Sequence, residues 1–305
     1  MHCDTIEEIR RLGVGLLNDK TQFSLRDQDK FSAGCQALAV FIPDEIRGED
    51  AVRFVDDYTA YTTKMVAEVS DRAEIAEHTA DITRINAEHK WAFMRTIESG
   101  ACLNGQLDLI DHFAALNYKM LGLVWNGANE LGSGWNNPEQ GLTDFGKKAV
   151  KRMEEVGMIV DCSHLNDKGI DDLLEIAEKP FAASHSNIRS VCAHKRNLRD
   201  DQFQEIVKRG GICGVNLFTR FLSDTDSKDP DMVFRHIYRM LELGGENTIA
   251  FGADFDGEIT APEGMNDPYG VCCFAEYLLK QGISQQVIDK LYFDNAVNFF
   301  QKNVK

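Results

Sequence analysis

Proline is scarce in this chain, with 6 residues among 305, and no proline- or serine-rich linker divides it. No run of eighteen or more apolar residues is present, so we expect no transmembrane helix. The first residues, Met1–Thr5, lack the basic start and the apolar run of a signal peptide. Together these absences predict a single domain over residues 1–305, with no membrane association and a cytoplasmic location.

Positive charge is also in deficit, because 33 Lys and Arg residues stand against 49 Asp and Glu residues, a net charge of −16. Such a surface repels phosphate backbones, which argues against a nucleic-acid partner. Most of the surplus acid is expected to be solvated surface, although acid in a cleft can hold divalent cations. The eight cysteines contain no CxxC pair and are interpreted as reduced thiols.

Short apolar runs ending in polar residues alternate with amphipathic segments along the whole chain. The runs predicted as strands are Met1–Thr5, Gly34–Ile42, Trp91–Glu98, Met120–Asn126, Met158–His164, Pro180–Ser186, Ile212–Phe218 and Thr248–Phe255. The longest segment between them, Val52–His89, is expected to hold two helices. Eight such units predict an α/β fold, a (β/α)8 barrel of the TIM type. A doubly wound open sheet is the alternative, and the absence of G-x-G-x-x-G gives no support to a dinucleotide fold.

Imidazoles and carboxylates stand where these predicted strands end. They are His2, Asp4, Glu98, Asp161, His164, His185, Asp254 and Asp256. The carboxyl ends of barrel strands meet at one face, so these side chains are expected to converge there as a metal site. Alternation along a strand places His2 and Asp4 on one face, and likewise Asp254 and Asp256 if the last strand continues that far.

Each of these residues also has an ordinary interpretation when taken alone. A single histidine at a strand end is more often a hydrogen-bonded core residue, and a turn rich in aspartate and glycine is common. The remaining histidines that we considered are expected at the surface, in helices or loops: His78, His89, His112, His194 and His236.

Five motifs in order resemble the membrane (renal) dipeptidase family of zinc peptidases. They are His2-x-Asp4, Thr96-Ile97-Glu98-Ser99-Gly100, Asp161-Cys162-Ser163-His164, Ala183-Ser184-His185-Ser186 and Gly252-Ala253-Asp254-Phe255-Asp256-Gly257. The segments Gly141–Gly146 and Cys192–Asn197 look like family segments too. The resemblance extends from residue 1 to about residue 300, and it implies an eight-stranded α/β barrel, often assembled as a homodimer.

The resemblance implies a role for each matching residue. His2 and Asp4 bind one zinc ion, His164 and His185 bind a second, and Glu98 bridges the two together with a water or hydroxide. Asp254 takes the proton of that water and passes it to the leaving amine. Arg196 binds the free carboxylate of a dipeptide, a group that its planar guanidinium fits. Many family members accept a D-residue at the carboxyl side, and some open β-lactams.

One position departs from the family pattern. Many members carry a histidine after the strand that corresponds to Leu121–Val124, where it helps to hold the substrate carbonyl oxygen. Trp125 stands there in this chain, followed by Asn126. The indole N–H of Trp125, Asn126 or Asn129 is a possible replacement donor. We therefore predict Trp125 and Asn126 as substrate-binding residues, together with Arg196.

Three hypotheses of function follow. The first is a zinc dipeptidase acting on dipeptides, L-D pairs included, for which cobalt or manganese would also suit the ligands. The second is a related binuclear barrel hydrolase acting on another amide, a lactone or an ester, which Trp125 favours and Arg196 disfavours. The third is a barrel that binds a metabolite or a partner without turnover, which the full ligand set disfavours.

Overall fold

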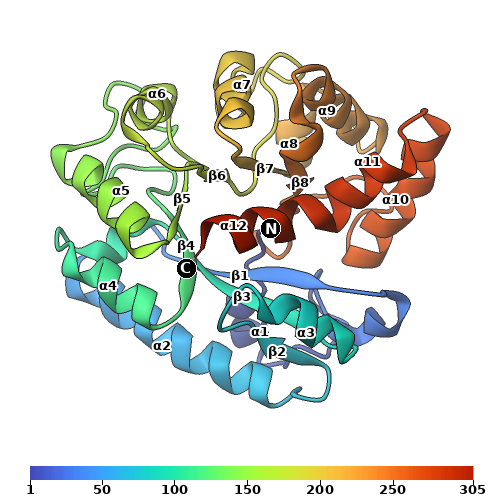
Figure 1. Ribbon diagram of the computed structural model, residues 1–305, viewed down its shortest axis with the longest axis horizontal. Helices are drawn as coiled ribbons and strands as arrows, with labels where there is room; N and C mark the ends of the chain where they lie inside the picture. Colours follow the sequence, from blue (N-terminus) through green and yellow to red (C-terminus); the bar gives the residue numbers. More distant parts are fainter. Residues whose placement is uncertain (305) are drawn as a thin grey trace.

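The computed structural model describes residues 1–304 as a ring of parallel strands enclosed by helices (Figure 1). The strands are β1 (Cys35–Phe41), β2 (Ala73–Ile75), β3 (Trp91–Glu98), β4 (Tyr118–Gly122), β5 (Ile159–Asp161), β6 (Ala182–Ala183), β7 (Ile212–Val215) and β8 (Ile249–Phe251). They pair in the order β1-β3-β4-β5-β6-β7-β8, with β2 also paired to β3, and every pairing is parallel.

The first residues of the chain join the two edges of this sheet. Cys3 forms a parallel bridge with Phe255, and the Asp4 backbone N–H donates to the Phe255 carbonyl at 2.9 Å. On the other side, the Ala39 N–H of β1 donates to the Cys3 carbonyl at 3.0 Å. These bonds close the sheet into a barrel, which confirms the predicted fold class.

The predicted strand Met1–Thr5 is wrong in its extent, because only Cys3 pairs and helix α1 (Thr5–Leu12) begins at once. The acidic first turn and basic last turn of α1 suit the helix dipole, and Gly13 ends the helix in the left-handed conformation with φ 65°. The turn at Asp4 therefore leaves this carboxylate at the barrel mouth instead of extending it along a strand.

Helices fill the connections between the strands. They are α2 (Gly48–Ala67), α3 (Asp81–Ala87), α4 (Asp108–Ala115), α5 (Asp144–Val156), α6 (Asp167–Ile176), α7 (Asp200–Lys208), α8 (Thr219–Leu222), α9 (Asp231–Glu242), α10 (Pro268–Lys280), α11 (Gln285–Asp289) and α12 (Asn295–Asn303). Shorter turns are η1 (Leu25–Lys30), η2 (Gly100–Leu103), η3 (Gly245–Asn247) and the π-helical η4 (Lys290–Asp294). The two helices expected in Val52–His89 are α2 and α3, with the unpredicted β2 between them.

The amino-terminal end of the barrel is closed by α12, which lies across the middle of the ring in Figure 1. Phe299 and Phe300 of this helix pack with buried residues of the strands: Met94, Met120, Ile159, Ala182, Ile212 and Ala250. Burial of a side chain such as Phe300 stabilises the fold by about 1.5–3 kcal/mol. The opposite, carboxyl-terminal mouth is thus the end left for a site. Among residues 1–304, no helix combines the length and the apolar composition that crossing a bilayer requires.

Candidate metal centre

The side chains predicted as metal ligands meet at the carboxyl-terminal mouth of the barrel. The two from the first segment are His2 and Asp4, and the others follow separate strands: Glu98 ends β3, His164 follows β5 and His185 follows β6. All five are buried, with 1–8% of each residue exposed. The structure therefore brings together the whole predicted ligand set from four places in the sequence.

Glu98 lies between His2 on one side and His164 and His185 on the other, and it directs one oxygen to each side. Its Oε2 is 3.2 Å from the Nε2 of His2, while its Oε1 is 2.7 Å from the Nε2 of His164 and 3.6 Å from that of His185. Both oxygens of one carboxylate thus face imidazole nitrogens, one on each side of Glu98.

A second group of acidic oxygens surrounds His2. The Nε2 of His2 is 3.4 Å from Asp4 Oδ1 and 3.6 Å from Asp254 Oδ1. The ligand atoms of these three residues lie within 4.8 Å of one another, as do those of His2, Glu98 and His185. His2 is common to both groups, so the two candidate cation positions are adjacent.

The tautomer of His164 follows from its hydrogen bonds. Its Nδ1 is 2.9 Å from Asn126 Oδ1, and the same oxygen accepts the indole N–H of Trp135 at 2.5 Å. Because an indole only donates, the atom facing His164 is the amide oxygen, and the His164 Nδ1 carries the proton. The Nε2 of His164 then has an unprotonated lone pair, available to bind a cation, and lies 2.7 Å from Glu98 Oε1.

His185 has an equivalent partner on its outer side. Its Nδ1 is 2.7 Å from the Ser184 hydroxyl, which also bonds to the buried carboxylate of Asp161. A carboxylate only accepts, so the hydroxyl proton belongs to the Asp161 bond and the Ser184 oxygen accepts from His185 Nδ1. The Nε2 atoms of His164 and His185 therefore face each other as two lone pairs.

The backbone at three of the strand ends is held in the left-handed region. Ser99, His164 and Asp254 have φ values of 83°, 71° and 65°. Such conformations cost about 1–3 kcal/mol for non-glycine residues and cluster at functional sites. The turns direct the side chains of His164 and Asp254 into the mouth, which a continued strand would not do.

Burial and mutual charge shift the pKa values of the cluster in opposite directions. Burial lowers the pKa of His164 to about 4, with Arg196 adding to the effect, and burial also lowers the pKa of His185. Burial raises the pKa of Asp4 to about 7, with Glu98 and Asp254 adding to it and His2 opposing it. The pKa of His2 is raised despite its burial, because Asp4 and Glu98 attract its positive charge.

The donor set fits divalent cations. The Nε2 of His2 and the Oδ1 of Asp4 are buried without a hydrogen-bond partner, although each lies in the centre of the cluster. Cations in this position would give these atoms a partner and would supply the positive charge that the carboxylates otherwise draw onto His2. Neutral imidazoles and carboxylates are ligands that Zn²⁺ prefers.

The predicted catalytic residue Asp254 also lies in the cluster, but its neighbour Asp256 does not. Asp254 Oδ2 accepts the side-chain N–H of Asn216 at 3.0 Å, which leaves Oδ1 facing His2. Asp256 turns away and accepts from the Thr5 hydroxyl at 2.6 Å and the Gln22 N–H at 2.7 Å. The condition for a shared face is not met, because β8 ends at Phe251 and both aspartates adopt positive φ.

Arg196 is buried beside the cluster with spare hydrogen-bonding capacity. Its guanidinium donates to Ser186 Oγ at 3.2 Å and to the His185 carbonyl at 3.3 Å, while its Nε–H is buried without a partner. A guanidinium with an unused donor is suited to an anionic group.

The two other predicted substrate contacts lie on the β4 side of the mouth. The half-buried ring of Trp125 packs edge-on against Phe41 at 4.7 Å between centroids and lies 6.4 Å from His164. Asn126 uses its Oδ1 to hold His164, as described above. Its role as a substrate contact stays a prediction, and it concerns the side-chain N–H₂ group.

Sequence reasoning missed the partners that orient the ligands, namely Trp135, Ser184 and Asn216. The adjacency of Ser184 and His185 was the available signal, since a hydroxyl next to a ligand histidine can reach its outer nitrogen. No comparable signal existed for Trp135 or Asn216, because their contacts depend on how loops fold over the mouth. His236, expected at the surface, is completely buried.

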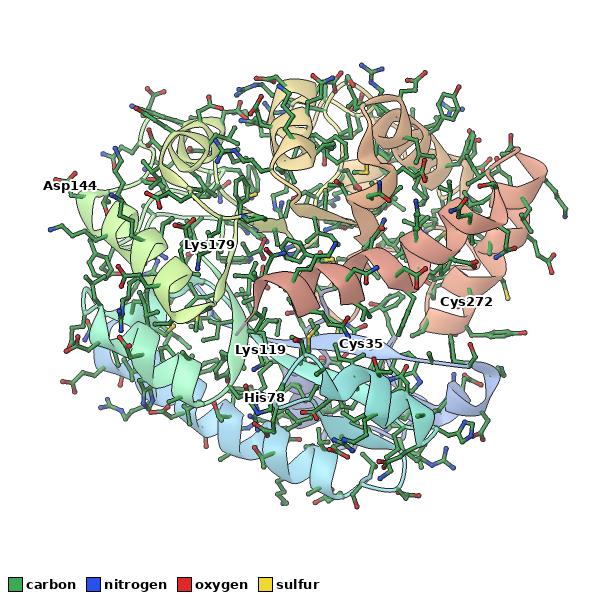
Figure 2. All side chains as sticks on the ribbon, in the orientation of Figure 1. Cys35, His78, Lys119, Asp144, Lys179 and Cys272 are labelled. Atoms are coloured by element: carbon green, nitrogen blue, oxygen red, sulfur yellow. The ribbon has the colours of Figure 1, made fainter. Side chains whose placement is uncertain are left out.

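A separate cavity of about 440 Å³ lies near the start of β1 and β3. Cys35 of β1 and Cys272 of α10 both line it (Figure 2). None of the residues of the metal centre is among its lining residues, so the cavity and the metal centre are distinct features of the fold.

Comparison with known proteins decides the family. The sequence profile of the membrane dipeptidase family (peptidase family M19) matches residues 2–305. The chain belongs to the membrane dipeptidase family. An uncharacterized protein in the pqqA 5′ region of Klebsiella pneumoniae is 32% identical over 266 residues, which is 84% of this chain and 97% of that protein.

Two solved structures share the fold, and the first of them is described as a member of family M19. One, a dipeptidase AC described as a metallo peptidase, has a TM-score of 0.93 at 24% identity, over 99% of this chain and 97% of that one. The other, with a TM-score of 0.91 at the same identity and coverage, is a Rhodobacter sphaeroides metallo peptidase liganded with a phosphinate mimic of L-Ala-D-Ala. The family resemblance expected from the five motifs is confirmed by the family profile over residues 2–305.

Proposed function

We propose that this chain hydrolyses dipeptides with two zinc ions held at the barrel mouth. His2 and Asp4 would bind one ion, His164 and His185 the other, and Glu98 would bridge them. The observation that carries this proposal is the division of the Glu98 carboxylate, with Oε2 on His2 and Oε1 on His164 and His185. Such cations polarise a carbonyl and make water acidic enough to lose a proton near neutral pH.

Asp254 would act as the proton carrier. Its Oδ2 is occupied by Asn216, so Oδ1 is the oxygen free to take a proton at the centre of the cluster. Burial raises the pKa of Asp254, with Glu98 adding to the effect, which suits a group that takes a proton from attacking water and returns it to a departing amine.

Arg196 would fix the free carboxylate of the dipeptide. Its unused Nε–H offers a donor for a substrate carboxylate, and its other nitrogens are held by Ser186 and the His185 carbonyl. Because the guanidinium is fixed relative to His185, a substrate bound to it would be oriented relative to the cations. Exopeptidase specificity for short peptides follows from this requirement for a charged end close to the scissile bond.

The decisive experiment combines metal analysis with a substrate panel. The purified protein should contain two zinc ions per chain and hydrolyse dipeptides, L-D pairs included. A chelator should abolish turnover and added zinc should restore it, with cobalt and manganese tested as replacements. A metal-loaded protein that hydrolyses amides, lactones or esters without a free carboxylate, but no dipeptide, would favour the alternative activity that Trp125 suggested.

Assembly and location stay predictions from the sequence. A homodimer is expected, and light scattering coupled to size-exclusion chromatography tests it. A cytoplasmic location is expected, and fractionation of cells expressing the protein tests it.

A further inference from the structure

Asp161 is a buried charged residue at the mouth that is not among the proposed ligands. It is 3% exposed and ends β5. Its Oδ1 accepts the backbone N–H groups of Ser163 and Ser184 at 3.0 and 2.9 Å, and its Oδ2 accepts the Ser184 hydroxyl. All the hydrogen bonds to this carboxylate therefore come from the two loops that carry His164 and His185.

The bond to the Ser184 hydroxyl has a direction that matters. A hydroxyl carries one proton, and the Asp161 carboxylate takes it. The Ser184 oxygen then accepts from His185 Nδ1 at 2.7 Å, which leaves the Nε2 of His185 unprotonated and directed toward Glu98. If the Ser184 hydroxyl accepted from residue 161 instead of donating to it, its proton would be available for His185 Nδ1.

We propose that Asp161 is a positioning residue that fixes the tautomer of His185 through the Ser184 hydroxyl, so that Nε2 is ready to bind a cation. The inference rests on the proposed metal centre and adds a residue to it. Partners of this kind raise the basicity of a ligand histidine and fix its orientation, and their loss costs about 10–100-fold in metal affinity.

Asp161 also has a plain structural interpretation, because its Oδ1 ties two loop N–H groups together. The two interpretations differ for the substitution Asp161→Asn. An amide keeps an oxygen for the two backbone N–H groups, but its N–H₂ group donates to Ser184. The Ser184 hydroxyl can then donate to His185 Nδ1 at 2.7 Å, a nearer acceptor than Ser163 Oγ at 3.3 Å. The proton of the imidazole then moves to Nε2, where it blocks the cation.

The experiment measures zinc affinity by competition with a chelator, in the wild type and three variants. Asp161→Asn should weaken zinc binding by about 10–100-fold. Ser184→Ala removes the hydroxyl that connects Asp161 to His185 without reversing its hydrogen bonds, and should cause a smaller loss of zinc affinity. The double variant Asp161→Asn/Ser184→Ala should bind zinc more tightly than Asp161→Asn alone, because the reversed hydroxyl is gone.

Asp172→Asn is the matched control. The Asp172 carboxylate also accepts a backbone N–H, that of Leu142 at 2.8 Å, but it bonds to none of the proposed ligands. It should leave zinc affinity unchanged. A purely structural role for Asp161 makes the losses add, so a double variant that binds zinc more weakly than either single variant overturns the inference. An Asp161→Asn variant with wild-type zinc affinity overturns it too.

A measurement on the wild type covers the case in which Asp161→Asn does not fold. Nitrogen NMR of the chelated, ¹⁵N-histidine-labelled protein should show His185 protonated on Nδ1, with the signal assigned by its loss in His185→Asn. Protonation on Nε2 would refute the inference. A wild-type protein that binds no zinc at all would refute the proposed function itself, so the two failures are distinguishable.

Discussion

The Nε2 atoms of His164 and His185 lie 2.8 Å apart, and neither has a proton to share. Asn126 and Ser184 hold the proton of each ring on the outer nitrogen. Two lone pairs at hydrogen-bond distance repel each other unless a cation lies against both. The arrangement of the pair therefore suits a metal ion bound between the two rings.

Removing the metal should therefore destabilise the protein. A ligand present at 100 times its dissociation constant contributes about 2.7 kcal/mol to the free energy of unfolding. We expect a chelator to lower the denaturant midpoint by a corresponding amount and zinc to restore it. Equal midpoints with and without the chelator, for a protein shown to contain zinc, would contradict this coupling.

Glu98→Gln should lose both of the proposed metal ions, because the carboxylate proposed to bridge them is replaced by a neutral amide. Turnover should fall by about 100-fold or more, since the cations supply several kcal/mol of transition-state stabilisation. Glu154→Gln is the control, because Glu154 is equally buried but accepts the N–H groups of Glu178 and Lys179 outside the mouth. Metal analysis of both variants checks the prediction, and full zinc occupancy in Glu98→Gln would contradict it.

Asp254 and Asp256 allow a paired test within one loop. Asp254→Asn should keep its zinc yet lose about 10²–10⁴-fold in kcat, the usual contribution of a proton carrier. Asp256→Asn should keep kcat but lower the free energy of unfolding by about 1–3 kcal/mol, because it weakens the bonds to Thr5 and Gln22. Kinetics and denaturation of the two variants separate the roles, and the reverse pattern would refute the assignment.

Arg196→Ala should act only on substrates that carry a free carboxylate. Losing a buried charged hydrogen bond costs about 10–100-fold in kcat/KM. The same dipeptides with an amidated carboxyl end should be cleaved equally slowly by wild type and variant. Arg220→Ala, at an exposed arginine of α8, should change neither rate. An equal loss on both substrate types would mean that Arg196 holds the loops instead of the substrate.

His236 should make stability depend on pH. Its Nδ1 accepts the Ile188 N–H at 3.1 Å and its Nε2 donates to the Leu222 carbonyl at 3.1 Å, so the buried ring has room for one proton only. Burial lowers its pKa from the usual 6.5 to about 4, against the opposing hydrogen bond to Leu222. Between these values the unfolded chain binds a proton that the folded chain does not.

The contribution of neutral His236 to the free energy of unfolding is therefore complete above pH 6.5 and is lost as the pH falls toward 4. The loss amounts to about 3 kcal/mol over this range. His236→Gln retains one donor and one acceptor but does not titrate, so its stability should fall less steeply. Urea unfolding of both proteins with a chelator present isolates this effect from the metal ligands, and identical slopes would contradict it.

Much of the site was predictable because strand ends are local features of the sequence. Glu98, His164 and His185 each follow an apolar run, and parallel strands bring such ends together whatever the loops do. The family resemblance and the barrel, both confirmed, rest on the same regularity. Asp254 was also predicted to follow a strand end. Its position in the mouth results from a left-handed turn and not from the alternation of side chains along a strand.

The wrong expectations concern residues whose position depends on distant parts of the chain. Met1–Thr5 has the composition of a strand, yet helix α1 starts at Thr5 and a single bridge closes the barrel. Asp256 is drawn away by the loop at Gln22, and β2 is a three-residue strand too short to give a pattern. His236 looked like a surface histidine because its two partners lie 48 and 14 residues away.

The barrel closure also dictates the order in which the molecule assembles. His2 leaves the ribosome long before Asp254, which follows the last strand, and the Thr5–Asp256 bond joins positions 251 residues apart. A nascent chain shorter than this holds its ligands on unconnected segments. Binding of metal at the proposed centre is therefore expected late in folding, because contacts of such long range are slow to form.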